Sequence, residues 1–126
     1  MPVKHIQQQM VGYCLPACAE MAVAQFGVGI SQSRLAKNLG TIPGVGTPFS
    51  ALGRLAAYDF SVEVTEWRGT DFLRSALSVR KVAIAAILTS NDLPGWKDSP
   101  TQHTVLVTAV EEKRVRYHDP ALSWAG

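Results

Sequence analysis

The chain has 126 residues, enough for one domain with a hydrophobic core and too few for two. Hydrophobic residues make up 47% and charged residues 17%, a globular composition that excludes a wholly disordered chain. The net charge is only +2 and the basic residues are dispersed, whereas nucleic-acid binders usually gather them on one face. We therefore expect a single domain over residues 1–126 and no nucleic-acid partner.

Membrane and secretion signals are not expected either. The longest apolar run, residues 82–88, is too short to cross a bilayer as a helix. The N-terminus has three glutamines, residues 7–9, where a secretory signal would have an apolar segment. These features predict a cytoplasmic location without direct membrane insertion. In that reducing compartment the 2 cysteines are not expected to form a disulfide framework.

Helical patterns occupy the first half of the chain. A helix is predicted over residues 15–26, because Pro16 is tolerated in a first turn and glycines follow the segment. Ser31 is a suitable N-cap for a short helix that Gly40 would stop. Glycine and proline make residues 40–48 a loop. The residues expected to share one face of a third helix are Phe49, Leu52, Leu55 and Ala56.

Strand patterns dominate the second half. Residues 61–66 alternate as a half-buried strand does, and residues 82–88 resemble a central strand covered on both faces. A short helix is predicted between them, over residues 71–77. Residues 103–110 and 115–117 are predicted to form a hairpin. Helices first and strands last favour an α+β fold, with N-terminal helices packed on a C-terminal antiparallel sheet.

Cys14 is the candidate nucleophile. It lies at the start of the first predicted helix, where unpaired backbone N–H groups and the helix dipole stabilise a thiolate. Gly12 leaves the approach to the thiol open. Gln8, six residues before Cys14, could donate its side-chain amide to an oxyanion, with the backbone N–H of Cys14 as the second donor.

A base and a group to orient it follow much later in the chain. His103 begins an apolar strand, and Asp119 follows the next strand, just before Pro120, which favours extended backbone. If the hairpin forms, both residues lie toward the same end of adjacent strands. The carboxylate could then accept a hydrogen bond from one ring nitrogen and leave the other facing Cys14. The order Gln8, Cys14, His103, Asp119 is the one that a papain-like cysteine peptidase needs.

Plainer roles exist for the same residues. A free cysteine is most often a small buried hydrophobe, and this is the role expected of Cys18, one turn further along the helix. Asp119 could belong to an ordinary turn. Cys14 and Cys18 could instead ligate zinc together with His5 or His118, although a second cysteine pair is missing. No cofactor or metal is expected.

Together these motifs resemble the peptidase domain of bacteriocin-exporting ABC transporters, which removes double-glycine leader peptides, and its stand-alone relatives. The family pattern is a glutamine, five residues, then Cys-Gly-Pro-Ala-Cys-Leu-x-Met. Here the pattern reads Gln8, then Cys14-Leu15-Pro16-Ala17-Cys18-Ala19-Glu20-Met21. Further resemblance lies in Gly46-Thr47-Pro48 with the third helix, and in His103 with Asp119-Pro120, so that it covers nearly the whole chain.

The resemblance implies a papain-like fold and a cysteine peptidase. It implies that Cys14 is the nucleophile, His103 the base, Asp119 the residue that orients the base, and Gln8 a part of the oxyanion hole. The implied substrate is a leader peptide or precursor protein cleaved after Gly-Gly. The implied partner is an ABC transporter, with the domain on the cytosolic face of the membrane.

Two positions depart from the family pattern, and other functions remain open. Tyr13 replaces a common acidic residue, and Leu15 replaces glycine. Leu15 is expected to add bulk beside the thiol and so to alter the preference for Gly-Gly. A catalytically idle peptide-binding module is one alternative, although such members characteristically lack the cysteine. A papain-like acyltransferase, transglutaminase or amidase is another, since the same groups serve those reactions equally.

Overall fold

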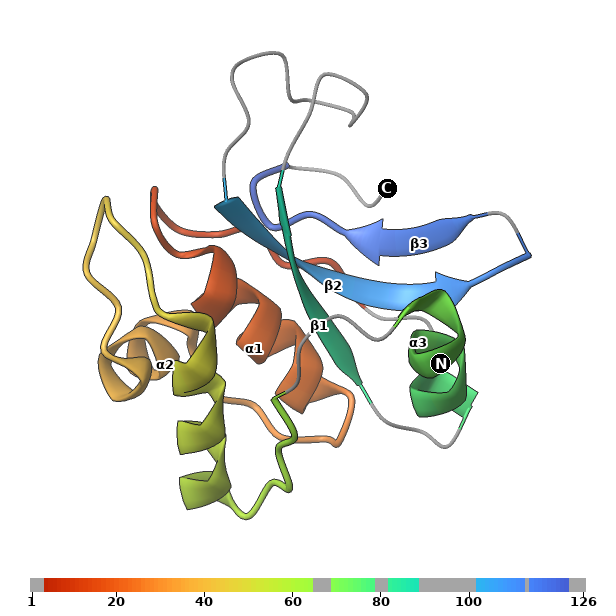
Figure 1. Ribbon diagram of the computed structural model, residues 1–126. Helices are drawn as coiled ribbons and strands as arrows, with labels where there is room; N and C mark the ends of the chain where they lie inside the picture. The colour runs from red at the N-terminus through yellow and green to blue at the C-terminus, as the bar shows by residue number, and fades with distance from the viewer. Residues whose placement is uncertain (1–3, 65–68, 79–81, 89–101, 113, 123–126) are drawn as a thin grey trace.

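The computed structural model describes residues 4–64, 69–78, 82–88, 102–112 and 114–122. Across these residues helices come first and an antiparallel sheet comes last, which confirms the predicted α+β class (Figure 1). The elements in chain order are α1 (Cys14–Ala24), α2 (Gln32–Leu39), the 3-10 helix η1 (Phe49–Tyr58), α3 (Gly69–Ser78), β1 (Ala83–Leu88), β2 (Gln102–Val110) and β3 (Val115–His118).

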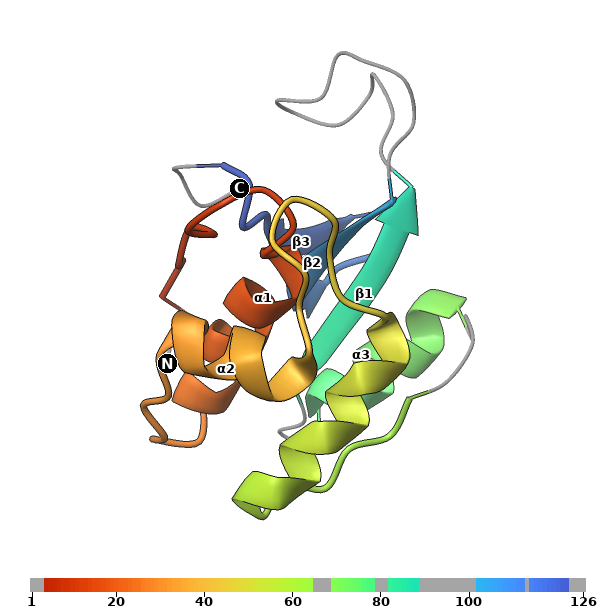
Figure 2. The ribbon, with the colours of Figure 1, turned by 90° about the vertical axis from the view of Figure 1, so that its left-hand side faces the viewer.

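Helix α1 is the centre of the molecule. It begins at Cys14, with Pro16 in the first turn as predicted, and it ends at Ala24, two residues before the predicted end. It packs against α2 on one side and against β2 on the other (Figure 2). A helix covered on two sides is apolar nearly all round, and eight of its residues are buried.

Helix α2 follows its local capping signals. The Ser31 hydroxyl accepts a hydrogen bond from the backbone N–H of Arg34 at 3.2 Å, which satisfies one of the unpaired donors of the first turn. Gly40 ends the helix in the left-handed conformation, at φ 75°. Both boundaries confirm the prediction, because both signals act within one turn of the chain.

The third helix forms, but as a 3-10 helix. With three residues per turn, positions three apart fall on one face, and Phe49, Leu52, Leu55 and Tyr58 all pack toward the core. Ala56 is exposed, so the prediction that it shares the buried face is wrong. That prediction assumed the 3.6-residue turn of an α-helix, which would have placed position 56 on the same side as position 49.

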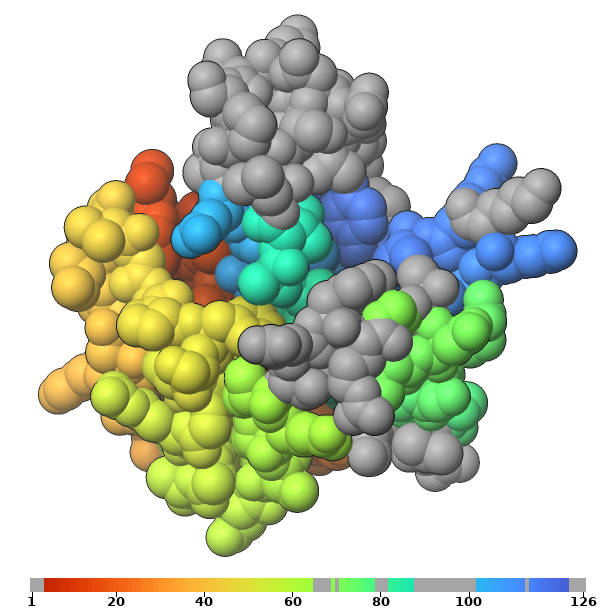
Figure 3. Space-filling view, in the orientation of Figure 1, coloured from red at the N-terminus to blue at the C-terminus, as the bar shows by residue number. Residues whose placement is uncertain are grey.

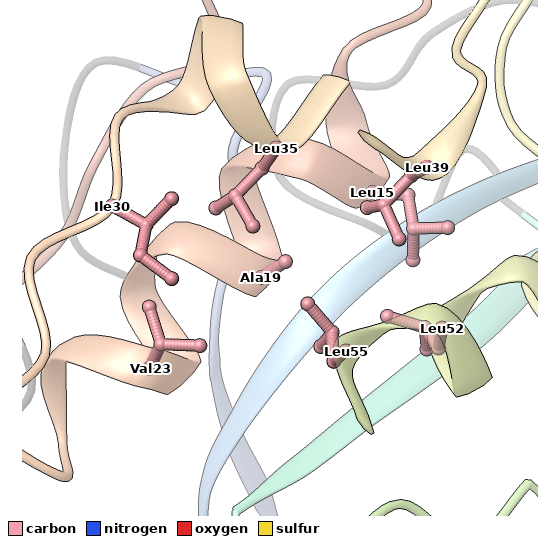
Figure 4. Packing of buried hydrophobic residues seen from close by; sticks show 8 residues of the cluster. All are labelled: Leu15, Ala19, Val23, Ile30, Leu35, Leu39, Leu52 and Leu55. Atoms are coloured by element: carbon pink, nitrogen blue, oxygen red, sulfur yellow. The ribbon is translucent and has the colours of Figure 1, made fainter. Parts of the chain in front are cut away.

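The main hydrophobic cluster lies between α1, α2 and η1. Each contributes aliphatic side chains that point into the common space (Figure 4). The buried members are Leu15, Ala19, Val23, Ile30, Leu35, Leu39, Leu52 and Leu55. A second cluster joins the other side of α1 to the sheet, with Cys18, Met21 and Ala22 packed against Leu106 of β2. Helix α1 is thereby held at a defined place over the sheet.

The sheet is antiparallel in the order β1-β2-β3 among the described strands. The hairpin of β2 and β3 confirms the prediction. The prediction of a central strand at residues 82–88 is wrong in position: β1 is an edge strand of this sheet, and Ala86 is exposed. The central strand is β2, whose residues 103–107 are buried. Apolar composition marks a strand, but it does not say how many neighbours the strand has.

The alternating segment at residues 61–66 is not a strand where the structure describes it. Residues 61–64 are irregular, and residues 65 and 66 lie outside the described part. Val62 packs against the main cluster, but none of the described strands pairs with the segment. In residues 61–64 the alternation of apolar and polar residues thus accompanies packing of Val62 against the core, without the hydrogen-bond pairing of a strand.

Helix α3 packs against β1 and β2 at the end of the sheet where β2 finishes (Figure 1). Arg74 on this helix donates to the carbonyl of Glu111, just after β2, at 3.4 Å. Helix α1 packs against β2 as well, and Cys14 at its beginning lies near the opposite end of the strand, where β2 starts. In the described part of the chain, every helix is too short or too polar to traverse a bilayer.

Candidate active site

Three elements meet where α1 crosses the beginning of β2. Cys14 is the first residue of α1, His103 is the second residue of β2, and Asp119 directly follows β3. The start of α1 lies beside the start of β2 (Figure 1). The hairpin brings the end of β3 back to the same place, since Leu106 pairs with His118. The fold thus brings together three residues that the sequence separates by up to 105 positions.

A buried hydrogen bond joins His103 to Asp119. The distance from Nε2 of the ring to Oδ1 of the carboxylate is 2.6 Å, and the two residues are only 6% and 3% exposed. Oδ1 also accepts from the backbone N–H of Ala121 at 2.9 Å, which keeps the carboxylate in place. His5 donates to the Asp119 carbonyl at 2.8 Å. Because Nε2 is held by the carboxylate, Nδ1 is the ring nitrogen that remains for the Cys14 sulfur.

The two titrating groups of the site shift in opposite directions. Burial alone would raise the pKa of Cys14, but hydrogen bonds from His103 and Thr104 and the charge of the ring outweigh it and lower the pKa below 9.0. Burial alone would lower the pKa of His103, but hydrogen bonds to Asp119 and Cys14 raise the pKa to about 9. Both shifts act in the same sense, because the lowered pKa of Cys14 favours the thiolate and the raised pKa of His103 favours the imidazolium ring.

Thr104 is a site residue that the sequence did not indicate. Its hydroxyl lies 3.3 Å from the Cys14 sulfur, and the residue is 7% exposed. A threonine in an apolar strand reads as an ordinary β-branched strand residue. Its position next to His103 was the only available signal, and that signal does not say toward which element the hydroxyl points.

Cys18 has a different environment from Cys14. It is fully buried, and burial raises the pKa of its thiol well above 9.0. The protonated thiol donates to the Thr104 carbonyl at 3.5 Å. These facts agree with the expected role of Cys18 as a buried structural residue. Within the described residues, no three His, Cys, Asp or Glu side chains are grouped so that they could hold a metal ion.

The loop before Cys14 is held by the loop after α2. Gly12 has φ 89°, and a Cβ at this position would lie 3.0 Å from the backbone nitrogens of Gly44 and Val45. The N–H of Gly44 donates to the carbonyl of Val11 at 2.8 Å, and the two loops adjoin on the surface (Figure 3). Gly12 therefore has a role that the sequence did not indicate, because its missing side chain makes room for the second loop.

Gln8 lies at the edge of the site, beside the turn that carries Asp119. Its backbone N–H donates to the carbonyl of Pro120 at 2.7 Å, and its side-chain amide donates to the carbonyl of Met10 at 3.0 Å. Its side-chain oxygen is buried and has no hydrogen-bond partner among the residues that the structure describes. The amide has a second N–H, so one donor could still turn toward an oxyanion.

Leu15 does not add bulk beside the thiol, and that expectation is wrong. The residue is 1% exposed, and its side chain belongs to the main cluster between α1, α2 and η1 (Figure 4). Neighbouring residues on a helix point about 100° apart, so Leu15 can enter the core while Cys14 faces β2. Tyr13, the other departure, is half-buried and precedes the helix as its N-cap residue.

Comparison with known proteins supplies one match. The chain matches the Peptidase_C39 like family over residues 1–126. No curated protein and no solved structure gives a significant match. The α+β architecture, with a cysteine at the start of a helix beside a histidine on the sheet, is consistent with the papain-like fold of such domains. The chain therefore belongs to the Peptidase_C39 like family and is a domain of the cysteine peptidase type.

Proposed function

We propose that this chain is a cysteine peptidase in which Cys14 attacks the substrate, His103 transfers the proton and Asp119 orients the ring. The observation that carries the proposal is the buried bond between His103 and Asp119, 2.6 Å long, with the Cys14 thiol beside the same ring. The lowered pKa of the neighbouring Cys14 thiol supports a catalytic role for the pair, because shifted pKa values are typical of functional sites. The chain belongs to a peptidase-like family, which supports the same proposal.

The proposed reaction follows from the protonation state of the pair. The Cys14 thiolate attacks the scissile carbonyl carbon, a C–S bond forms, and the carbonyl oxygen takes the negative charge. The C–N bond then breaks as the His103 imidazolium gives its proton to the leaving amine. A water molecule, losing a proton to the neutral ring, attacks the thioester. The C–S bond then breaks, the carboxylic acid product leaves, and the Cys14 thiolate is regenerated.

Gln8 is the proposed side-chain donor to the oxyanion. The backbone N–H of Cys14, at the beginning of α1, has no partner within the helix and is the proposed second donor. A side-chain donor of this kind is worth about 3 kcal/mol in the transition state. The backbone hydrogen bond of Gln8 to Pro120 supports the assignment, because it ties the residue to the Asp119 turn.

The proposed substrate is a precursor peptide cut after a Gly-Gly leader, with an ABC transporter as partner at the cytosolic face of the membrane. The resemblance of the Gln8–Met21 segment to transporter peptidases supports this choice. The inward direction of Leu15 supports it too, since the side chain does not fill the space of a small substrate residue next to the thiol.

The surface beside the thiol fits an apolar peptide. The loop before α1 and the loop after α2, joined by the Gly44–Val11 hydrogen bond, expose several large apolar side chains. The exposed residues are Met10, Val11, Ile42 and Val45, which are 46%, 72%, 58% and 78% exposed. Exposed apolar groups gathered at one site favour a partner that carries apolar side chains.

Thiol labelling tests the enzymatic proposal, and Cys18 is an internal control. Iodoacetamide should alkylate Cys14 at neutral pH and leave the buried Cys18 unmodified, as read by mass spectrometry of the two sites. Cys14→Ala should abolish cleavage of a precursor with a Gly-Gly leader, whereas Cys18→Ala should retain it. An unreactive Cys14 would contradict the proposal.

Substrate variants separate the parts of the proposal. Cleavage of the Gly-Gly precursor, but not of a matched Ala-Ala precursor, is the expected result. Tight binding of both precursors without turnover, together with an unreactive thiol, would identify an idle peptide-binding module instead. Transfer of the acyl group to an added amine in place of water would identify an acyltransferase.

A further inference from the structure

Thr104 contacts both cysteines of α1. Its hydroxyl oxygen lies 3.3 Å from the Cys14 sulfur, and its carbonyl accepts a hydrogen bond from the Cys18 thiol at 3.5 Å. Cys14 and Cys18 are four residues apart on the helix, so both sulfurs face β2 at this one residue. The backbone of Thr104 is itself held within the sheet, because Thr104 pairs with Ala86 of β1.

The direction of the hydrogen bond follows from the charge of the sulfur. A thiolate has no hydrogen to give, so the Thr104 hydroxyl must donate whenever Cys14 is ionised. Thr104 is only 7% exposed, so water competes weakly for the hydroxyl donor. His103 and Thr104 are neighbours on β2, and the ring of the first and the hydroxyl of the second both contact the Cys14 sulfur.

We propose that Thr104 is a positioning residue of the site, whose hydroxyl donates to the Cys14 thiolate and holds the sulfur in line with His103. This inference rests on the proposed role of Cys14 as the nucleophile. In this arrangement the thiolate has two donors instead of one. The hydroxyl releases its bond when the sulfur loses its charge on attacking a carbonyl.

A purely structural role would leave a different signature. Thr104→Val keeps the volume and the branched shape of the side chain but removes the hydroxyl. Thr104→Ser keeps the hydroxyl but removes the methyl group. If the hydroxyl acts on the thiolate, the valine variant raises the pKa of the Cys14 thiol and the serine variant does not. If Thr104 only fills space, the serine variant disturbs the site and the valine variant does not.

The measurement is the rate of alkylation of Cys14 by iodoacetamide as a function of pH, followed at that residue by mass spectrometry. Thr104→Val should move the midpoint of the profile up by about one pH unit, since a hydrogen bond to a charged group is worth roughly that much. Thr104→Ser should leave the midpoint near the wild-type value. Thr104→Ala, a second variant without the hydroxyl, should shift the profile as valine does, and it replaces valine if that variant does not fold.

Two results would overturn the inference and can be told apart from a failure of the proposed function. A wild-type profile with a lowered midpoint that valine and alanine leave unchanged refutes the role of Thr104 alone. A serine profile shifted as far as that of valine refutes it too, because the hydroxyl is still present. A wild-type Cys14 that does not react at all refutes the proposed function, and the role of Thr104 with it.

Discussion

Asp119→Asn is the change that examines the site most directly. The asparagine side chain has nearly the same shape, and its oxygen can still accept from Nε2 of His103 and from the N–H of Ala121. What disappears is the negative charge, 2.6 Å from the ring. The substitution therefore separates the electrostatic effect of the carboxylate from its effect on the orientation of the ring.

The expected magnitude follows from the pKa of His103. The pKa is raised from 6.5 to about 9 in spite of burial, and Asp119 contributes both a hydrogen bond and a charge to the rise. A full return to 6.5 would correspond to about 3 kcal/mol, at about 1.4 kcal/mol per unit. At pH 7.5 the protonated fraction of the ring would fall from about 97% to about 9%, roughly tenfold.

Proton NMR titration of the rings measures this shift directly, because the chain has only 3 histidines. The cleavage rate should show the same change: it rises with pH as Cys14 ionises and falls as His103 loses its proton near pH 9. In Asp119→Asn the falling limb should move to lower pH. Asp71→Asn is the matched control, since Asp71 is exposed and its loss should leave His103 unchanged. A His103 pKa near 9 in the Asp119→Asn protein would refute the reasoning.

Three further predictions concern residues around the thiol. Gln8→Ala should lower kcat by a factor of about 100 to 1,000 while alkylation of Cys14 is unchanged, and a parallel loss of alkylation would point to a disturbed thiol instead. Gly12→Ala should lower the free energy of unfolding by about 1–3 kcal/mol in denaturant titrations, more than Gly27→Ala, which shares the positive φ but has open space around it. Leu15→Met, which conserves volume in the core, should leave the Gly-Gly preference unchanged, and an altered cleavage-site profile would show that the side chain reaches the substrate.

Features that depend on neighbouring residues were predictable. Ser31 and Gly40 mark the ends of α2 because their hydrogen bond and backbone angle act within one turn. Pro16 marks the first turn of α1, because only there can a helix accept a residue without an N–H. The order of elements, and the ends of strands on which His103 and Asp119 stand, followed from the same local patterns.

Features that depend on distant residues were not predictable from pattern alone. Thr104 meets Cys14 across 90 positions, and only the way α1 lies over β2 brings the hydroxyl to the sulfur. The inward direction of Leu15, the close approach of two loops at Gly12 and the edge position of β1 all depend on which surfaces become neighbours. Residue types thus indicated which chemistry the chain could carry. Packing decided which side chains reach the thiol, because burial and distance are properties of contacts between elements rather than of any one segment.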